Sequence, residues 1–249
     1  MDSTYISYEE QDELGTALVK AREKGSAKNK PYVDIFALAE SFGLTVRFEN
    51  FAEEDATKDG FLSDGAAPVR IWSNGQRVNA VFPSGTIVID SYLRRPNMET
   101  KLRFTVAHEI AHYIGNIHQR TASFHSEFDA ERTYDPEEFR QMFGFQEIQA
   151  NNLGGILLTP SHKLQKVYKK VTGGKLLTQY GDRTIDADTR EKIAEMAKMM
   201  KVSQATMRIR LERLKLFKKL PIDQYVESGR FDLDNYSLFQ EGMTDELPF

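Results

Sequence analysis

The sequence predicts an α+β fold, in which a small, mostly antiparallel sheet packs on helices. Short segments rich in β-branched and aromatic residues lie between residues 44 and 90, and turn signals such as SNG and PSG separate them. From about residue 97 the hydrophobic pattern becomes helical, and further helical segments follow to residue 217. The 249-residue chain is long enough for one substantial core with a small appendage, or for two modest domains.

The N-terminal segments are predicted to be helices followed by strands. An amphipathic helix runs from about residue 8 to 24, GSAKNKP forms a linker, and a second helix, VDIFALAESFG, ends at Gly43, which suits a helix C-cap. The predicted strands are LTVRF, VRIW, NAVF and TIVID.

The C-terminal half is predicted to be mostly helical. A helix over residues 97–115 is followed by a polar segment, 119–141, in which Asp135 and Pro136 form a good helix start. The later helices are EIQANNLGGILL, SHKLQKVYKKV and the pair TREKIAEMAKMM and SQATMRIRLERLKLF, with Ser203 as an N-cap. We therefore expect four regions: residues 1–30, 31–172, 183–220 and an acidic tail, 221–249.

Composition limits the possible functions. The net charge of −4 gives no reason to expect a general nucleic-acid binder. The absence of cysteine excludes disulfides, thiolate metal sites and a cysteine nucleophile. The acidic N-terminus lacks the features of a signal peptide, and no apolar run could span a bilayer, so we expect a cytoplasmic protein.

The strongest functional signal is HEIAH, residues 108–112, an HExxH motif within a predicted helix. Histidines at positions i and i+4 lie on one helix face, so His108 and His112 can bind a single zinc ion. Zinc lowers the pKa of a bound water to roughly 7, which lets Glu109 take the proton and pass it to the leaving amine.

The residues themselves leave the third ligand open. His118 completes the metzincin pattern HExxHxxGxxH, although no methionine lies in an obvious tight turn after it. Glu147 in EIQAN can instead supply a carboxylate from a second helix, with Asn151 one turn later as a hydrogen-bond partner for a ligand histidine. His125 and His162 are expected to be surface histidines, and no oxyanion stabiliser is evident.

RFTVAHEIAHYI followed by EIQANNLGGILLTP resembles the ImmA/IrrE family of bacterial and phage metallopeptidases, in which an RFTxAHExxH helix precedes an ExxAN helix. The resemblance covers most of residues 31–217. It implies a zincin-like fold, zinc bound by His108, His112 and Glu147 in a gluzincin-like set, and Glu109 as the catalytic residue. Two features depart from the family pattern: segment 119–141 is longer than usual, and Gly154 and Gly155 stand where alanine is commoner.

The resemblance also implies a substrate. Such proteins typically cleave a partner helix-turn-helix transcriptional repressor and so switch on genes of a mobile element or a stress response. The alternative is a DNA-binding or antitoxin-type regulator with a structural or idle metal site. For it, the C-terminal helix pair would read DNA through Arg208, Arg210 and Arg213. A hairpin that packs on the core or binds protein is the competing interpretation, and the acidity of the chain disfavours DNA.

Two further segments have open roles. TIVID is either an ordinary core strand or an edge strand that pairs with extended substrate near the metal. Segment 119–141 is either a solvated loop or a lid beside the site.

Overall fold

The computed structural model describes residues 6–52, 59–115, 123–124 and 136–227. Its helices are α1 (Tyr8–Arg22), α2 (Ile35–Ser41), α3 (Glu99–Gly115), α4 (Pro136–Leu158), α5 (Ser161–Thr172), α6 (Ala187–Met200), α7 (Gln204–Arg213) and α8 (Ile222–Glu227). Short 3-10 helices cover Gly25–Asn29, Ser91–Arg94 and Pro96–Met98. The strands are β1 (Thr45–Glu49), β2 (Gly60–Leu62), β3 (Val69–Ser73), β4 (Gln76–Ala80), β5 (Thr86–Asp90), β6 (Ser123–Phe124), β7 (Leu177–Tyr180) and β8 (Phe217–Leu220).

The main sheet has the strand order β1-β5-β2-β6 and is mixed but mostly antiparallel, which confirms the predicted α+β class. β1 and β5 are parallel, whereas β2 runs antiparallel to both of its neighbours. Residues 86–89 of β5 are all buried, and β5 lies between two other strands. TIVID is therefore a core strand, and the alternative that it forms a substrate-binding edge is wrong.

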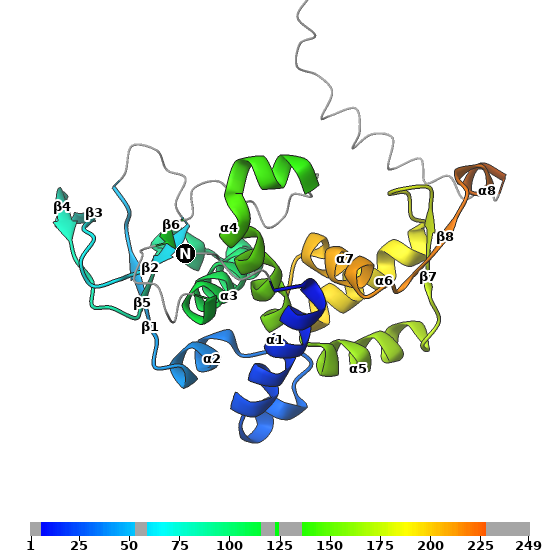
Figure 1. The fold of residues 1–249 in the computed structure, drawn as a ribbon, viewed down its shortest axis with the longest axis horizontal. Helices are drawn as coiled ribbons and strands as arrows, with labels where there is room; N and C mark the ends of the chain where they lie inside the picture. Colours follow the sequence, from blue (N-terminus) through cyan, green and yellow to red (C-terminus); the bar gives the residue numbers. More distant parts are fainter. Residues whose placement is uncertain (1–5, 53–58, 116–122, 125–135, 228–249) are drawn as a thin grey trace, which may run out of the picture.

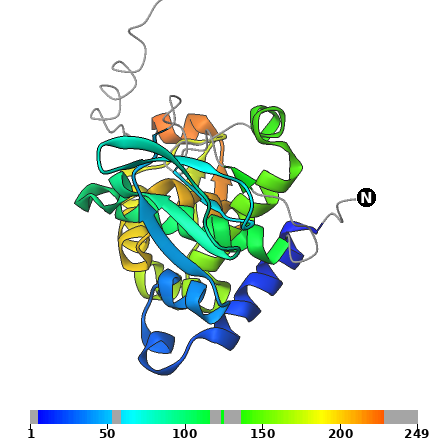
Figure 2. The same ribbon diagram turned by 90° about the vertical axis from the view of Figure 1, so that its left-hand side faces the viewer.

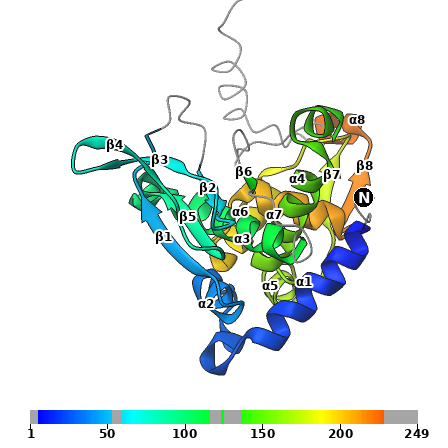
Figure 3. The same cartoon turned by 60° about the vertical axis from the view of Figure 1, so that its left-hand side comes forward.

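Strands β1 to β6 lie towards one end of the molecule, and the C-terminal helices lie at the other end together with β7 and β8; α3 and α4 lie between them (Figure 1). The view in Figure 2 places the strands in front of the helices, and Figure 3 shows the β3–β4 hairpin at the margin of the molecule. A small apolar cluster holds this hairpin to the main sheet; it consists of Phe61, Val69, Ile71, Phe82 and Val88.

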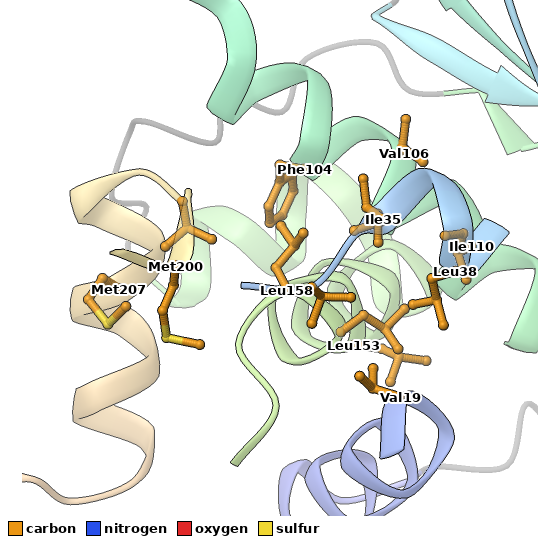
Figure 4. Packing of buried hydrophobic residues seen from close by; sticks show 14 of the residues in the cluster. Val19, Ile35, Leu38, Phe104, Val106, Ile110, Leu153, Leu158, Met200 and Met207 are labelled. Atoms are coloured by element: carbon orange, nitrogen blue, oxygen red, sulfur yellow. The ribbon is translucent and has the colours of Figure 1, made fainter. Parts of the chain in front are cut away.

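One large apolar core joins the helices on both sides of α3 and α4. Ten of its members, from α1, α2, α3, α4, α6 and α7, are labelled in Figure 4: Val19, Ile35, Leu38, Phe104, Val106, Ile110, Leu153, Leu158, Met200 and Met207. Because this core is continuous, α3 and α4 are held by packing on several sides. They form a rigid base for any side chains that they present to one another.

Local sequence signals explain several helix ends. Ser7 and Glu10 form a reciprocal capping box at the start of α1. Ser203 caps α7 as predicted, by accepting a hydrogen bond from the backbone N–H of Thr206.

The end of α7 differs from the prediction. The helix stops at Arg213, and Lys215 adopts a positive φ of 57°, so the chain turns away from the helix axis. The next residues form β8, which pairs in parallel with β7. The predicted helix to residue 217 is therefore too long.

No described helix has both the length and the apolar character needed to cross a membrane.

Candidate metal centre

Helix α3 carries HEIAH within its most buried stretch. His108 and His112 are 1% and 4% exposed, and Glu109 is completely buried. One helical turn separates the two histidines, and their Nε2 atoms lie 2.7 Å apart. The motif thus presents two imidazole nitrogens to one point, as its spacing predicts.

Helix α4 brings Glu147 to the same point. Its Oε2 lies 3.3 Å from Nε2 of His108, and its Oε1 lies 3.2 Å from Nε2 of His112. His108, His112 and Glu147 form the one candidate metal cluster among the described residues. His118, the competing third ligand, lies outside those residues, and so does His125.

Asn151 orients the first histidine. Its Oδ1 lies 2.8 Å from Nδ1 of His108, one turn after Glu147 on the same helix. Because a carbonyl oxygen can only accept a hydrogen bond, His108 donates from Nδ1, and its Nε2 is the nitrogen with a free lone pair. Such an outer hydrogen bond fixes both the tautomer and the ring angle of a metal-binding histidine.

The three side chains fit a single divalent metal ion. Two neutral imidazoles and one carboxylate are a donor set typical of catalytic zinc. With metal–ligand bonds of about 2.0–2.2 Å, tetrahedral ligand atoms lie about 3.3–3.6 Å from each other. The distances from Glu147 to the two histidines are already 3.2 and 3.3 Å, whereas the two Nε2 atoms lie 2.7 Å apart and have to separate by about 0.6 Å when a metal binds. A tetrahedral ion held by these three side chains would have a fourth position open for a reactant.

Comparison with known proteins agrees with this geometry. The family model Peptidase_M78, described as an IrrE N-terminal-like domain, matches residues 39–212. The chain belongs to the IrrE N-terminal-like peptidase family. This confirms the resemblance drawn from the HExxH and ExxAN segments, and makes the chain a member of a metallopeptidase family. A comparison with curated proteins finds no match.

Glu109, the glutamate of the HExxH motif, lies in a completely buried environment. Burial raises the pKa of Glu109 to about 8; the nearby His112 and the backbone N–H of Leu62 lower it, whereas the charge of Glu147 raises it further. Burial lowers the pKa of His112, but the hydrogen bond that His112 donates to Glu147 and the charges of Glu109 and Glu147 outweigh burial and raise the pKa overall. A metal cation at this point would favour the ionised carboxylates and the neutral imidazoles.

His162 is not part of the centre. It lies in the first turn of α5 and is partly exposed, in keeping with the predicted surface position. Burial and the neighbouring Lys163, Lys166 and Lys20 lower its pKa.

Gly154 allows α3 and α4, the two helices of the candidate metal cluster, to approach each other closely. A Cβ atom at this position would lie 3.2 Å from both the Cα and the backbone N of His108, whereas one at Gly155 would meet nothing within 4 Å. The sequence marked this pair only as a departure from the commoner alanine. Which glycine faces α3 depends on the packing of two helices, which no local pattern specifies.

The two glycines are expected to respond differently to alanine. Gly155→Ala should raise the free energy of unfolding by about 0.5–1 kcal/mol, because alanine favours helix. Gly154→Ala should raise the free energy of unfolding by less than this, because α3 has to shift by a few tenths of an ångström to admit the new methyl group. Gly154→Ala should also weaken zinc binding. Urea denaturation and zinc titration of both variants test this, and equal behaviour in both measurements would contradict it.

Proposed function

We propose that the protein is a zinc-dependent endopeptidase that cleaves a partner helix-turn-helix transcriptional repressor, and thereby relieves repression in a mobile-element or stress-response system. The observation that carries the peptidase proposal is the convergence of His108 and His112 from α3 with Glu147 from α4, beside the buried Glu109. Family membership supports hydrolysis of a protein substrate. The choice of a repressor rests on the resemblance to the ImmA/IrrE family.

Each residue then has a distinct role. His108 and His112 bind the metal through Nε2, Glu147 binds it through its carboxylate, and Asn151 holds His108 in the required tautomer. When bound, zinc supplies Lewis-acid chemistry that polarises the scissile carbonyl and activates water. The carboxylate of Glu109 accepts a proton from the attacking water and donates it to the leaving amine nitrogen. Burial of Glu109 keeps bulk water away from this proton transfer.

The contacts of Arg210 count against the DNA-binding alternative. Arg210, on α7, is 2% exposed. Its guanidinium donates to the carbonyl oxygen of Thr159, the hydroxyls of Tyr8 and Ser161, and the carboxylate of Asp12. A side chain that links α7 to α1 and to the start of α5 in this way cannot also reach a base edge in the major groove.

The other two arginines of the helix pair also make contacts within the protein. Arg208 pairs with Glu212 and donates to the backbone oxygen of Arg183, and Arg213 stacks on the ring of Tyr8. These contacts favour a packed helical hairpin. The pair α6–α7 is then a support for α4 or a surface for the protein substrate.

The test uses as candidate substrates the helix-turn-helix repressors of the source genome, beginning with any that a neighbouring gene encodes. The zinc-loaded full-length protein should cut one of them into two discrete fragments, measured by mass spectrometry. Cleavage should stop when a chelator removes the metal and return when zinc is added, because the ligands remain intact without the ion.

A mobility-shift assay with random and candidate operator DNA provides the counter-test. An uncut repressor, together with salt-resistant and sequence-selective DNA binding by this protein, would contradict the peptidase proposal and favour a regulator.

A further inference from the structure

Helix α4 turns two of its faces to two different neighbours. Glu147, Asn151 and Gly154 have the spacing i, i+4, i+7, so they lie on one face, and this face contacts α3. Leu153 and Ile156 lie on another face, which contacts the N-terminal helix α1. α4 is therefore held between α1 and the helix that carries the HExxH motif.

The contact between α1 and α4 is closest at Gly15, which is buried. A Cβ atom at this position would lie 2.6 Å from Cγ2 of Ile156 and 3.0 Å from Cδ1 of Leu153. The methyl group of Leu153 is the end of a flexible side chain and can move aside. Cγ2 of Ile156 cannot, because it is bonded directly to Cβ, the χ1 angle of a β-branched residue in a helix is stiff, and the side chain is completely buried. At this spacing of the two helices only glycine fits.

The side of α4 that faces α3 has no spare room either. A Cβ atom at Gly154 would lie 3.2 Å from both the Cα and the backbone N of His108, so the backbones of the two helices are in close contact at the first histidine of the motif. Because protein interiors are close-packed, a displacement of α4 by α1 is passed on to α3 and is not absorbed by empty space.

Buried ion pairs hold α1 in place on both sides of Gly15. Asp12 pairs with Arg210 of α7, whose side chain is 2% exposed. Glu23, just after α1, pairs with Lys163 of α5 over 3.1 Å, and Lys163 also donates to two backbone carbonyl oxygens that follow α1. Separating a buried cation from its carboxylate is costly. An added side-chain atom at Gly15 is therefore expected to displace α4 and not α1.

We propose that Gly15 is a positioning residue for the metal centre: through it, α1 sets how closely α4, with Glu147 and Asn151, lies against the histidines of α3. This inference rests on the proposed zinc peptidase, and it adds a helix that precedes residue 39, where the match to the family begins. Ligand distances in metal sites vary by only about 0.2 Å, so a displacement of α4 by a few tenths of an ångström is enough to alter the coordination.

Gly15→Ala places one methyl group against Ile156. We expect this variant to bind zinc about tenfold more weakly than the wild type, which is the lower end of the range for losing an outer partner of a ligand. Competition with a chromophoric chelator measures the affinity. Gly155→Ala is the matched control, because it makes the same change on α4 itself, where the new methyl group meets nothing within 4 Å. Its zinc affinity should equal that of the wild type.

Cobalt(II) reports the geometry of the site directly. Zinc has a filled d shell and gives no visible spectrum, whereas the visible absorption of bound cobalt depends on its coordination geometry. The cobalt bands of Gly15→Ala should differ from those of the wild type in position or intensity. The bands of Gly155→Ala should coincide with those of the wild type.

A size exchange separates positioning from stability. Adding Ile156→Ala to Gly15→Ala removes the methyl group that the new side chain meets, so zinc affinity and the cobalt spectrum should return towards those of the wild type. The same change leaves a cavity, so the midpoint of thermal unfolding of the metal-free protein should fall further. If Gly15 acted only on stability, the double variant would bind zinc still more weakly.

Two results would overturn the proposal: zinc binding by Gly15→Ala equal to that of the wild type, or a double variant that does not recover it. Neither measurement involves cleavage. A failure of the peptidase proposal would therefore appear in the repressor assay alone, and a failure of the positioning proposal in the metal measurements alone.

Discussion

Replacing Glu109 with glutamine is expected to reduce repressor cleavage by about 10²- to 10⁴-fold, the range that general acid–base catalysis contributes. Glutamine has nearly the same shape but cannot accept a proton from water. In the metal-free protein burial raises the pKa of Glu109 to about 8, so near pH 7 this side chain is already protonated and uncharged. The buried position should therefore accept a neutral amide without loss of the fold.

Two controls separate lost chemistry from lost structure. Zinc content by elemental analysis should remain one ion per chain in Glu109→Gln, because neither histidine nor Glu147 changes. The midpoint of thermal unfolding of the metal-free variant at pH 7 should stay near that of the wild type. Cleavage within a factor of two of the wild type, with zinc bound, would show that another group moves the proton.

The part of the site that the sequence predicts fully is the part that lies within one helix. His108 and His112 are four residues apart, so helical geometry alone directs both to one point. Glu147 lies 35 residues after His112, and its place depends on how α4 packs against α3. Residue spacing alone could not choose between it and His118, and the family resemblance supplied the choice.

In the fold, too, the elements whose pattern lies within one segment were predicted, and those that depend on pairing with distant segments were missed. The long periodic helices and the apolar strand β5 were predicted, because their patterns are strong within a single segment. β2 was missed: it has three residues, GFL, and is a strand only because β5 and β6 lie on either side of it. The backbone N–H of Leu62, which lowers the pKa of Glu109, therefore escaped prediction. β7 and β8 were missed for the same reason, since they form a two-stranded sheet with each other from segments about 40 residues apart.

Glu147→Ala is expected to weaken zinc binding far more than any change outside the ligand set. Loss of an outer hydrogen-bond partner typically costs 10- to 100-fold in metal affinity, and this is the effect expected for the matched control Asn151→Ala. Glu147 contributes a charged ligand atom itself, so its removal should cost about 10³-fold or more.

The fold should tolerate the change at Glu147. Its side chain is 22% exposed, so water can fill the space and the free energy of unfolding of the metal-free protein should change little. Competition with a chromophoric chelator measures both affinities, and His118→Ala provides the decisive comparison. If Glu147→Ala retains zinc and His118→Ala loses it, the third ligand is His118, as in the metzincin pattern, and not Glu147. Because Glu147 lies on α4, weaker zinc binding in Glu147→Ala with His118→Ala unaffected would show that the metal joins the two central helices.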